Sequence, residues 1–146
     1  MFFEEFSEGQ VFKSRGRIIT STDLEVFTAL TWATNPIFLD DNVAKSRGLP
    51  GRVVPGALTL SYAIGLLYQQ GIFDHILALT AINNLSFKSP VMVGDEIEAE
   101  AIVSSKTETQ KPGMGIVSFA MSCRNKTKNT TCLQCEMTFI IIRQKS

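Results

Sequence analysis

Two cysteines three positions apart carry the spacing in this sequence that most resembles a metal or redox motif. Cys132 and Cys135 form a Cys-x-x-Cys pair, Cys123 stands alone, and His75 is the single histidine. A structural zinc site needs four such ligands, and the sequence has no second cysteine pair. On a β-strand, a separation of three would point the paired side chains to opposite faces. We therefore predict reduced, structural thiols, and neither a metal site nor a cofactor.

Other side chains able to move a proton are few and scattered. Asp40 and Asp41 are adjacent carboxylates, but Asp40 also suits the cap of a short helix beginning at Asp41. His75 follows a long apolar segment, and helix rise alone places it roughly 20 Å from the start of that segment. The remaining polar candidates are hydroxyls that do not titrate near neutral pH: Thr31, Thr34, Thr59 and Tyr62.

Composition excludes several classes of partner. The 146 residues carry fourteen basic and fourteen acidic side chains, a formal net charge of zero, so neither nucleic acid nor an anionic membrane is a default partner. Hydrophobic residues at 45% and charged residues at 19% fit one globular domain over residues 1–146. The acidic start, with Glu4 and Glu5, lacks the basic region of a signal peptide, which predicts a cytoplasmic protein.

Helix and turn signals organise the first half of the chain. Residues 11–19 predict a short strand, and a helix should follow and end near Thr31, before Asn35-Pro36. Its apolar face is Leu24, Phe27 and Leu30. The helix start has two alternative capping pairs, Thr20 with Asp23 and Thr22 with Glu25. Residues 37–54 then read as a crossing segment with one short helix after Asp40.

The longest apolar segment is a central helix. Pro55-Gly56 opens it, and it extends from Ala57 to about Gln70, where Gly71 ends it. Residues 53–73 carry no charge and have about the length of a bilayer span, but they contain proline and several glycines and have no flanking cations. A fully buried helix is therefore the preferred interpretation.

The second half consists of four runs typical of β-strands, over residues 76–89, 96–110, 114–126 and 130–143. One apolar helix followed by four long antiparallel strands predicts an α+β architecture, in which a curved sheet wraps around the helix. Because the helix is expected to be apolar on every side, a second subunit should cover what the sheet leaves open.

Three stretches, in order and spacing, resemble the MaoC-like family of acyl-thioester hydratases and dehydratases. They are Asn35-Pro36-Ile37-Phe38-Leu39-Asp40, the run from Gly51 to Thr59, and Phe87-Lys88-Ser89-Pro90-Val91 followed by Gly94-Asp95. The resemblance implies the hot-dog fold, a dimer, and a ligand that is an acyl thioester of coenzyme A or acyl carrier protein. It also implies the addition of water across a trans-2,3 double bond, or the reverse dehydration that forms this bond. An Asp and a His five positions apart would carry out the proton transfer.

The sequence departs from this family at both catalytic positions. The Asp position falls on Ala33 and the His position on Phe38, and neither side chain can move a proton. The helix-start glycine, whose N–H stabilises the thioester oxygen in the family, maps onto Gly56. The resemblance thus gives no catalytic residue, and implies a substrate-binding region of Ala33, Asn35, Phe38, Pro55, Gly56 and Ala57. Within it, Ala33, Phe38 and Gly56 should form one pocket.

Three functions remain open from the sequence. The first is an acyl-thioester-binding protein without hydration chemistry, acting as a homodimer or as the partner of a subunit that carries the Asp and His, as in the family's heterodimeric dehydratases. The second is an active hydratase, dehydratase or thioesterase that uses other residues. The third is a hot-dog scaffold that binds no ligand.

Overall fold

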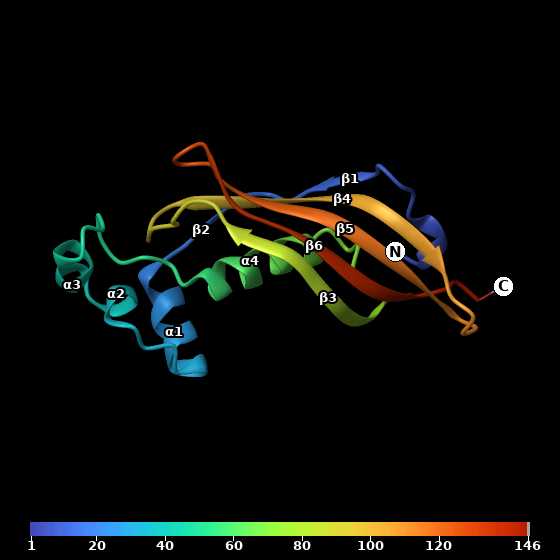
Figure 1. Ribbon diagram of the computed structural model, residues 1–146, viewed down its shortest axis with the longest axis horizontal. Helices are drawn as coiled ribbons and strands as arrows, with labels where there is room; N and C mark the ends of the chain where they lie inside the picture. The colour runs from blue at the N-terminus through green and yellow to red at the C-terminus, as the bar shows by residue number, and fades with distance from the viewer. Residues whose placement is uncertain (146) are drawn as a thin grey trace.

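A six-stranded antiparallel sheet curves along the molecule, and one long helix lies against its concave face (Figure 1). The computed structural model describes residues 1–145. The strands are β1 (Val11–Lys13), β2 (Arg17–Ile18), β3 (Ile76–Phe87), β4 (Glu96–Glu108), β5 (Met114–Asn125) and β6 (Thr130–Ile142). They are ordered β1-β4-β5-β6-β3, with β2 also pairing with β4. The four long strands and their antiparallel pairing confirm the prediction for the second half of the chain.

The long strands form because apolar and polar residues alternate along them. In β4, Ile97, Ala99, Ala101 and Val103 are buried, while the glutamates between them face the other side of the sheet. The buried row of one strand meets that of the next, and aromatic rings fill the centre. Phe73, Phe119 and Phe139 pack there with ring centroids 4.7 to 5.8 Å apart.

Helix α4 (Gly56–Tyr68) is the central helix that the sequence predicts. Its inner face is buried against the sheet, with Ala63 and Leu67 fully inaccessible to solvent. It is not apolar on every side, however, because a row of small or amphipathic residues is exposed: Ala57, Ser61, Gly65 and Tyr68. No helix within residues 1–145 has the length and hydropathy needed to cross a membrane.

Three further helices project beyond one end of the sheet (Figure 1). They are α1 (Ser21–Thr31), α2 (Pro36–Leu39) and α3 (Asp41–Ser46), and a short 3₁₀ turn, η1 (Phe3–Glu5), lies near the N-terminus. Of the two capping pairs, the structure forms Thr20 with Asp23. Leu24 of the predicted apolar face is buried, but Leu30 is 80% exposed, because the last turn of α1 extends past the sheet.

Two local predictions were wrong. The strand expected over residues 11–19 is divided into β1 and β2, because the Ser14 hydroxyl replaces a backbone acceptor by receiving the Ala99 N–H at 2.8 Å. Residues 37–54 were expected to hold one helix, but Asn35 caps an additional single turn, α2, by accepting the Ile37 N–H at 3.2 Å. Asp40 caps α3 as expected, at 2.8 Å from the Asn42 nitrogen.

The cysteine side chains also depart from the expectation that Cys132 and Cys135 point to opposite faces of a strand. Cys123, Cys132 and Cys135 are free thiols, and all three are buried. A register shift opposite Cys123 inserts one residue into β6, so Cys132 and Leu133 are both buried in succession. Cys132 and Cys135 are therefore both buried, and neither side chain lies on an exposed face of the sheet. The Cys132 thiol donates a hydrogen bond to the Cys123 carbonyl oxygen at 3.2 Å.

The capping box of α1 predicts a pH-dependent contribution to stability. Partial burial opposes ionisation of Asp23, but hydrogen bonds from the Thr20 N–H and the Tyr62 hydroxyl, with the Arg17 charge, lower the pKa of Asp23. Asp23→Asn should lower the free energy of unfolding by about 1 kcal/mol at neutral pH. Because the folded-state pKa is lowered, this contribution is complete above the unfolded pKa of about 3.9 and is lost as pH falls through the folded value.

Urea denaturation of both proteins from pH 7 to pH 2.5 measures this difference. The gap between wild type and Asp23→Asn should close below about pH 4. A gap of constant size across this range would show that the carboxylate charge contributes nothing to the cap.

Candidate functional site

The N-terminus of α4 opens into a hollow of about 420 Å³. Three parts of the chain form its wall: the entry and first turn of α4, the end of β3 with the segment after it, and the bulge of β6. The lining residues are Val53, Val54, Gly56, Thr59, Phe87, Lys88, Ser89, Pro90, Val91 and Cys132. Two of the three stretches that resemble the MaoC-like family, those at Gly51–Thr59 and Phe87–Val91, thus meet at one place.

Gly56 supplies the helix-terminal donor at this hollow. The Pro55 carbonyl accepts from the N–H groups of Leu58 and Thr59 at 3.0 and 3.1 Å, which begins α4. Within residues 1–145, no hydrogen bond engages the Gly56 N–H, as expected for the first turn of a helix. This free donor and the positive end of the helix dipole favour a carbonyl oxygen or an anion.

A close neighbour disfavours any side chain larger than that of glycine at position 56. A Cβ built on Gly56 would lie 2.9 Å from the ring of Phe87, which is tighter than an ordinary van der Waals contact. Phe87 is itself 52% exposed, so its ring forms a movable wall of the hollow and not part of the core.

The two positions that correspond to the family's Asp and His lie outside this wall. Ala33 lies in the turn between α1 and α2, and Phe38 lies in α2; both are half-buried, and neither lines the hollow. The turn begins at Trp32, which has a left-handed backbone with φ of 61°. One contact ties α2 to the entry of α4, because the Val53 N–H donates to the Ile37 carbonyl at 3.1 Å.

Of the three residues expected to form one pocket, Gly56 lines this hollow, and Ala33 and Phe38 do not. Asn35 acts as a helix cap. Pro55 is buried as the cap residue of α4, and Ala57 is exposed on the opposite side of the first turn.

The polar residues weighed as substitutes for the missing pair have other contacts. His75 lies in the turn between α4 and β3 and stacks on Phe2, with ring centroids 3.8 Å apart. The Thr31 hydroxyl donates to the Phe27 carbonyl at 2.7 Å. Residues 1–145 contain no group of three or more His, Cys, Asp or Glu side chains placed to hold a metal ion.

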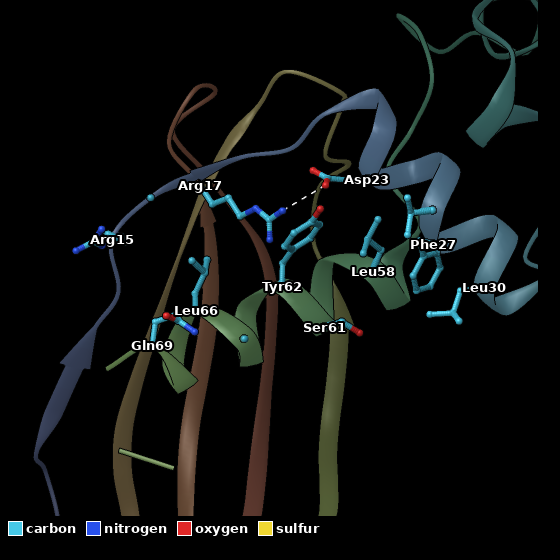
Figure 2. Close-up of a pocket in the computed structure, with 13 residues that line it drawn as sticks. Arg15, Arg17, Asp23, Phe27, Leu30, Leu58, Ser61, Tyr62, Leu66 and Gln69 are labelled. Carbon is cyan, nitrogen blue, oxygen red and sulfur yellow. Dashed lines mark hydrogen bonds and ion pairs between the residues drawn. The ribbon is translucent and has the colours of Figure 1, made fainter. Parts of the chain in front are cut away.

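A second hollow, of about 670 Å³, lies between α1 and α4 and contains a cluster that the sequence analysis missed (Figure 2). An Arg17 nitrogen lies 3.2 Å from an Asp23 oxygen, and the guanidinium carbon stands 4.4 Å from the centroid of the Tyr62 ring. Burial first, and then the hydrogen bond to Asp23, raise the pKa of Tyr62. With the carboxylate ionised and the phenol neutral, this cluster suits recognition and not proton transfer.

The missed cluster had only weak signals in the sequence. Asp23 belonged to one of the two alternative capping pairs, and the structure forms its pair with Thr20. Nothing in the spacing of Arg17 and Tyr62, which are 45 positions apart, indicated that they stack. Their contact depends on how β2 and α4 pack together.

Comparison with known proteins agrees with this fold and with the motifs that meet beside Gly56. The family model described as "MaoC like domain" matches residues 4–122. A relative in Rhodospirillum rubrum, an (R)-specific enoyl-CoA hydratase, is 26% identical over 84% of this chain and 80% of its own length. This chain therefore belongs to the MaoC-like domain family.

Solved structures give the same result for the fold. A monoamine oxidase regulatory protein from Archaeoglobus superposes with a TM-score of 0.89 at 26% identity, over 99% of this chain and 96% of that chain. A conserved hypothetical protein of Mycobacterium tuberculosis with a double hot-dog fold gives 0.88 at 20% identity, over 100% of this chain and 45% of that chain. The predicted hot-dog fold is confirmed, and this chain matches about half of a double unit.

The close contact at Gly56 predicts a coupling between two substitutions. Gly56→Ala alone should destabilise the protein, because its methyl group forces the Phe87 ring to move. With Phe87→Ala present, the same change should become neutral or stabilising, because alanine favours a helix more than glycine does. A double-mutant cycle measured by denaturation should show a coupling of about 1 kcal/mol. Additive effects would contradict the contact.

Proposed function

We propose that this protein binds an acyl thioester, carried by coenzyme A or by acyl carrier protein, at the hollow beside Gly56 without catalysing hydration at an ordinary enzymatic rate. One observation carries the proposal. The free helix-terminal donor of Gly56 is present, whereas the positions of the family's acid and base are occupied by Ala33 and Phe38.

The donor alone suits binding. A thioester oxygen at the start of α4 would receive the Gly56 N–H and the field of the helix dipole. The wall around it is largely apolar, with Val53, Val91 and Phe87 on different sides, which fits an acyl chain. Lys88 adds a cation at this hollow, suited to the phosphate that both carriers contain.

Hydration needs more than this site offers. Water must be activated by a base and a proton must be delivered by an acid, and positioned proton transfer contributes about 10²- to 10⁴-fold in rate. The residues lining the hollow include neither a carboxylate nor an imidazole. Ala33 and Phe38, at the positions where the family has its acid and base, lie outside this wall and supply no proton-transfer group either.

The proposed assembly is a pair of hot-dog units, formed either by two copies of this chain or with a family member that carries the Asp and His. Strand β3 is the sheet edge opposite β1, and its twelve residues carry no charge. Leu77 and Leu79 are 53% and 42% exposed on it. A long, uncharged, apolar edge strand is a template for pairing with another strand, and a pair would correspond to the double unit that this chain half matches.

Enzyme assays with matched variants test the missing acid and base. Wild type should bind the saturated thioester butyryl-CoA in calorimetry but should hydrate crotonyl-CoA very slowly. Ala33→Asp combined with Phe38→His should raise hydration by about 10²-fold or more, because the Val53 N–H to Ile37 carbonyl hydrogen bond ties this segment to the entry of α4. Each single change should do much less, because the two groups act as a unit. Placing the same residues one position away, as Thr34→Asp with Leu39→His, is the control and should leave the rate unchanged.

Each contrary outcome identifies a different function. Hydration by wild type at an ordinary rate would show that other residues carry the chemistry. Release of free coenzyme A from both thioesters would indicate a thioesterase. Failure of butyryl-CoA to bind would leave a scaffold without this ligand. Circular dichroism of every variant shows whether the fold is retained.

The proposed pairing through β3 predicts the oligomeric state. At micromolar concentration, light scattering should give twice the chain mass of 16.1 kDa. Leu77→Lys with Leu79→Lys should give monomers, because charges on an edge strand prevent pairing. Val11→Lys, at an equally exposed position on β1, should remain dimeric. A monomeric wild type, or equal effects at both edges, would contradict pairing through β3.

A further inference from the structure

The wall of the hollow beside Gly56 contains three side chains with a hydroxyl or thiol group: Thr59, Ser89 and Cys132. Two of these groups already have partners. The Ser89 hydroxyl donates to a carbonyl oxygen of β6 at 3.1 Å, and the Cys132 thiol donates to the Cys123 carbonyl oxygen at 3.2 Å. Within residues 1–145, no hydrogen bond to another residue engages the Thr59 hydroxyl.

The Thr59 hydroxyl lacks even the local bond that helical hydroxyls commonly make. A serine or threonine within a helix can donate to the backbone carbonyl one turn earlier. Ser61 of α4 and Thr31 of α1 do so, at 2.9 and 2.7 Å. The carbonyl available to Thr59 in this way is that of Pro55, and it accepts two backbone N–H groups instead. The hydroxyl is therefore left for a partner outside the helix.

This hydroxyl is almost enclosed and yet open to the hollow. Thr59 is only 3% exposed. In the part of the chain that the structure describes, no polar side-chain atom is both sealed from solvent and without a partner. The Thr59 oxygen must therefore reach the open space of the hollow that it lines. Burying a hydroxyl without a hydrogen bond costs free energy, and a ligand atom in the hollow would supply the missing bond.

The Thr59 hydroxyl and the free Gly56 N–H are directed to the same place. Thr59 stands three residues after Gly56, so both lie on one face of α4. Helix rise separates them by only about 4.5 Å along the axis. A helical side chain points back toward the N-terminus of its helix, which directs the hydroxyl toward the first turn. One oxygen atom at the start of α4 can then receive both donors.

From this arrangement we infer that Thr59 is a second hydrogen-bond donor of the site and binds, together with the Gly56 N–H, the carbonyl oxygen of the thioester. The inference rests on the proposed function, because it concerns the same ligand. A carbonyl oxygen has two lone pairs, so it accepts both donors without competition between them. Val53, Val54 and Val91 in the same wall have no side-chain donor, so this pair determines where the carbonyl group lies.

Calorimetry with butyryl-CoA and S-butyl-CoA tests the donor, because the second compound is a thioether that lacks only the carbonyl oxygen. Wild type should bind butyryl-CoA more tightly. Thr59→Val keeps the shape of the side chain and removes the hydroxyl, so it should weaken butyryl-CoA about three- to tenfold and leave S-butyl-CoA unchanged. Thr59→Ser should keep most of the affinity. Ser61→Ala, two residues further along α4, is the control and should change neither ligand.

Two further measurements separate a bond to the ligand from a role in the fold. Hydrogen bonds lower the stretching frequency of a carbonyl group, and infrared difference spectra of butyryl-CoA labelled with ¹³C at this carbon should show part of that shift lost in Thr59→Val. Without ligand, Thr59→Val should raise the urea midpoint, because it removes a buried hydroxyl that has no partner. A hydroxyl that supported the fold would lower the midpoint when removed.

The contrary outcomes are distinct. Equal losses of butyryl-CoA and S-butyl-CoA in Thr59→Val, or no loss of either, would overturn the inference and leave the proposed binding intact. A loss confined to 3-hydroxybutyryl-CoA would show that the hydroxyl contacts a substituent of the acyl chain and would also overturn it. If wild type binds neither butyryl-CoA nor S-butyl-CoA, the proposed function itself fails, and the inference fails with it.

Discussion

Burial of α4 against the curved sheet is the interaction on which the rest of this structure depends. Each large apolar side chain placed between helix and sheet contributes about 1.5–3 kcal/mol, and Leu67, Phe73 and Phe139 are almost fully inaccessible to solvent. This packing fixes where α4 begins. Its first turn, at Gly56, is held where the end of β3 passes, and the free N–H of the candidate site follows from that placement.

The same helix serves two hollows because its surface is not uniform. Gly56 and Thr59 face the hollow at its N-terminus, whereas Tyr62 and Leu66 face the groove beside α1. The first hollow offers a backbone donor in a largely apolar wall, which suits a neutral carbonyl. The second holds the Arg17–Asp23 ion pair and the Tyr62 ring beside apolar side chains of α1 and α4.

The projecting helices α1 to α3 determine what chemistry is possible. In this chain the positions at which the family has its acid and base lie on this projection, at Ala33 and Phe38, outside the wall of the Gly56 hollow. Caps at Thr20, Asn35 and Asp40 begin its three helices. A binding surface without proton transfer is consistent with that arrangement.

The sequence by itself determined the central helix, the four long strands, the cap at Asp40 and the motifs that identify the family, because these depend on local propensity and spacing. Only the tertiary structure decided the division of the first strand by Ser14, and the bulge that buries Cys132. It also decided the stacking of Arg17 on Tyr62 and the separation of Phe38 from the Gly56 hollow. Each of these depends on contacts between residues distant in sequence, to which local patterns are insensitive.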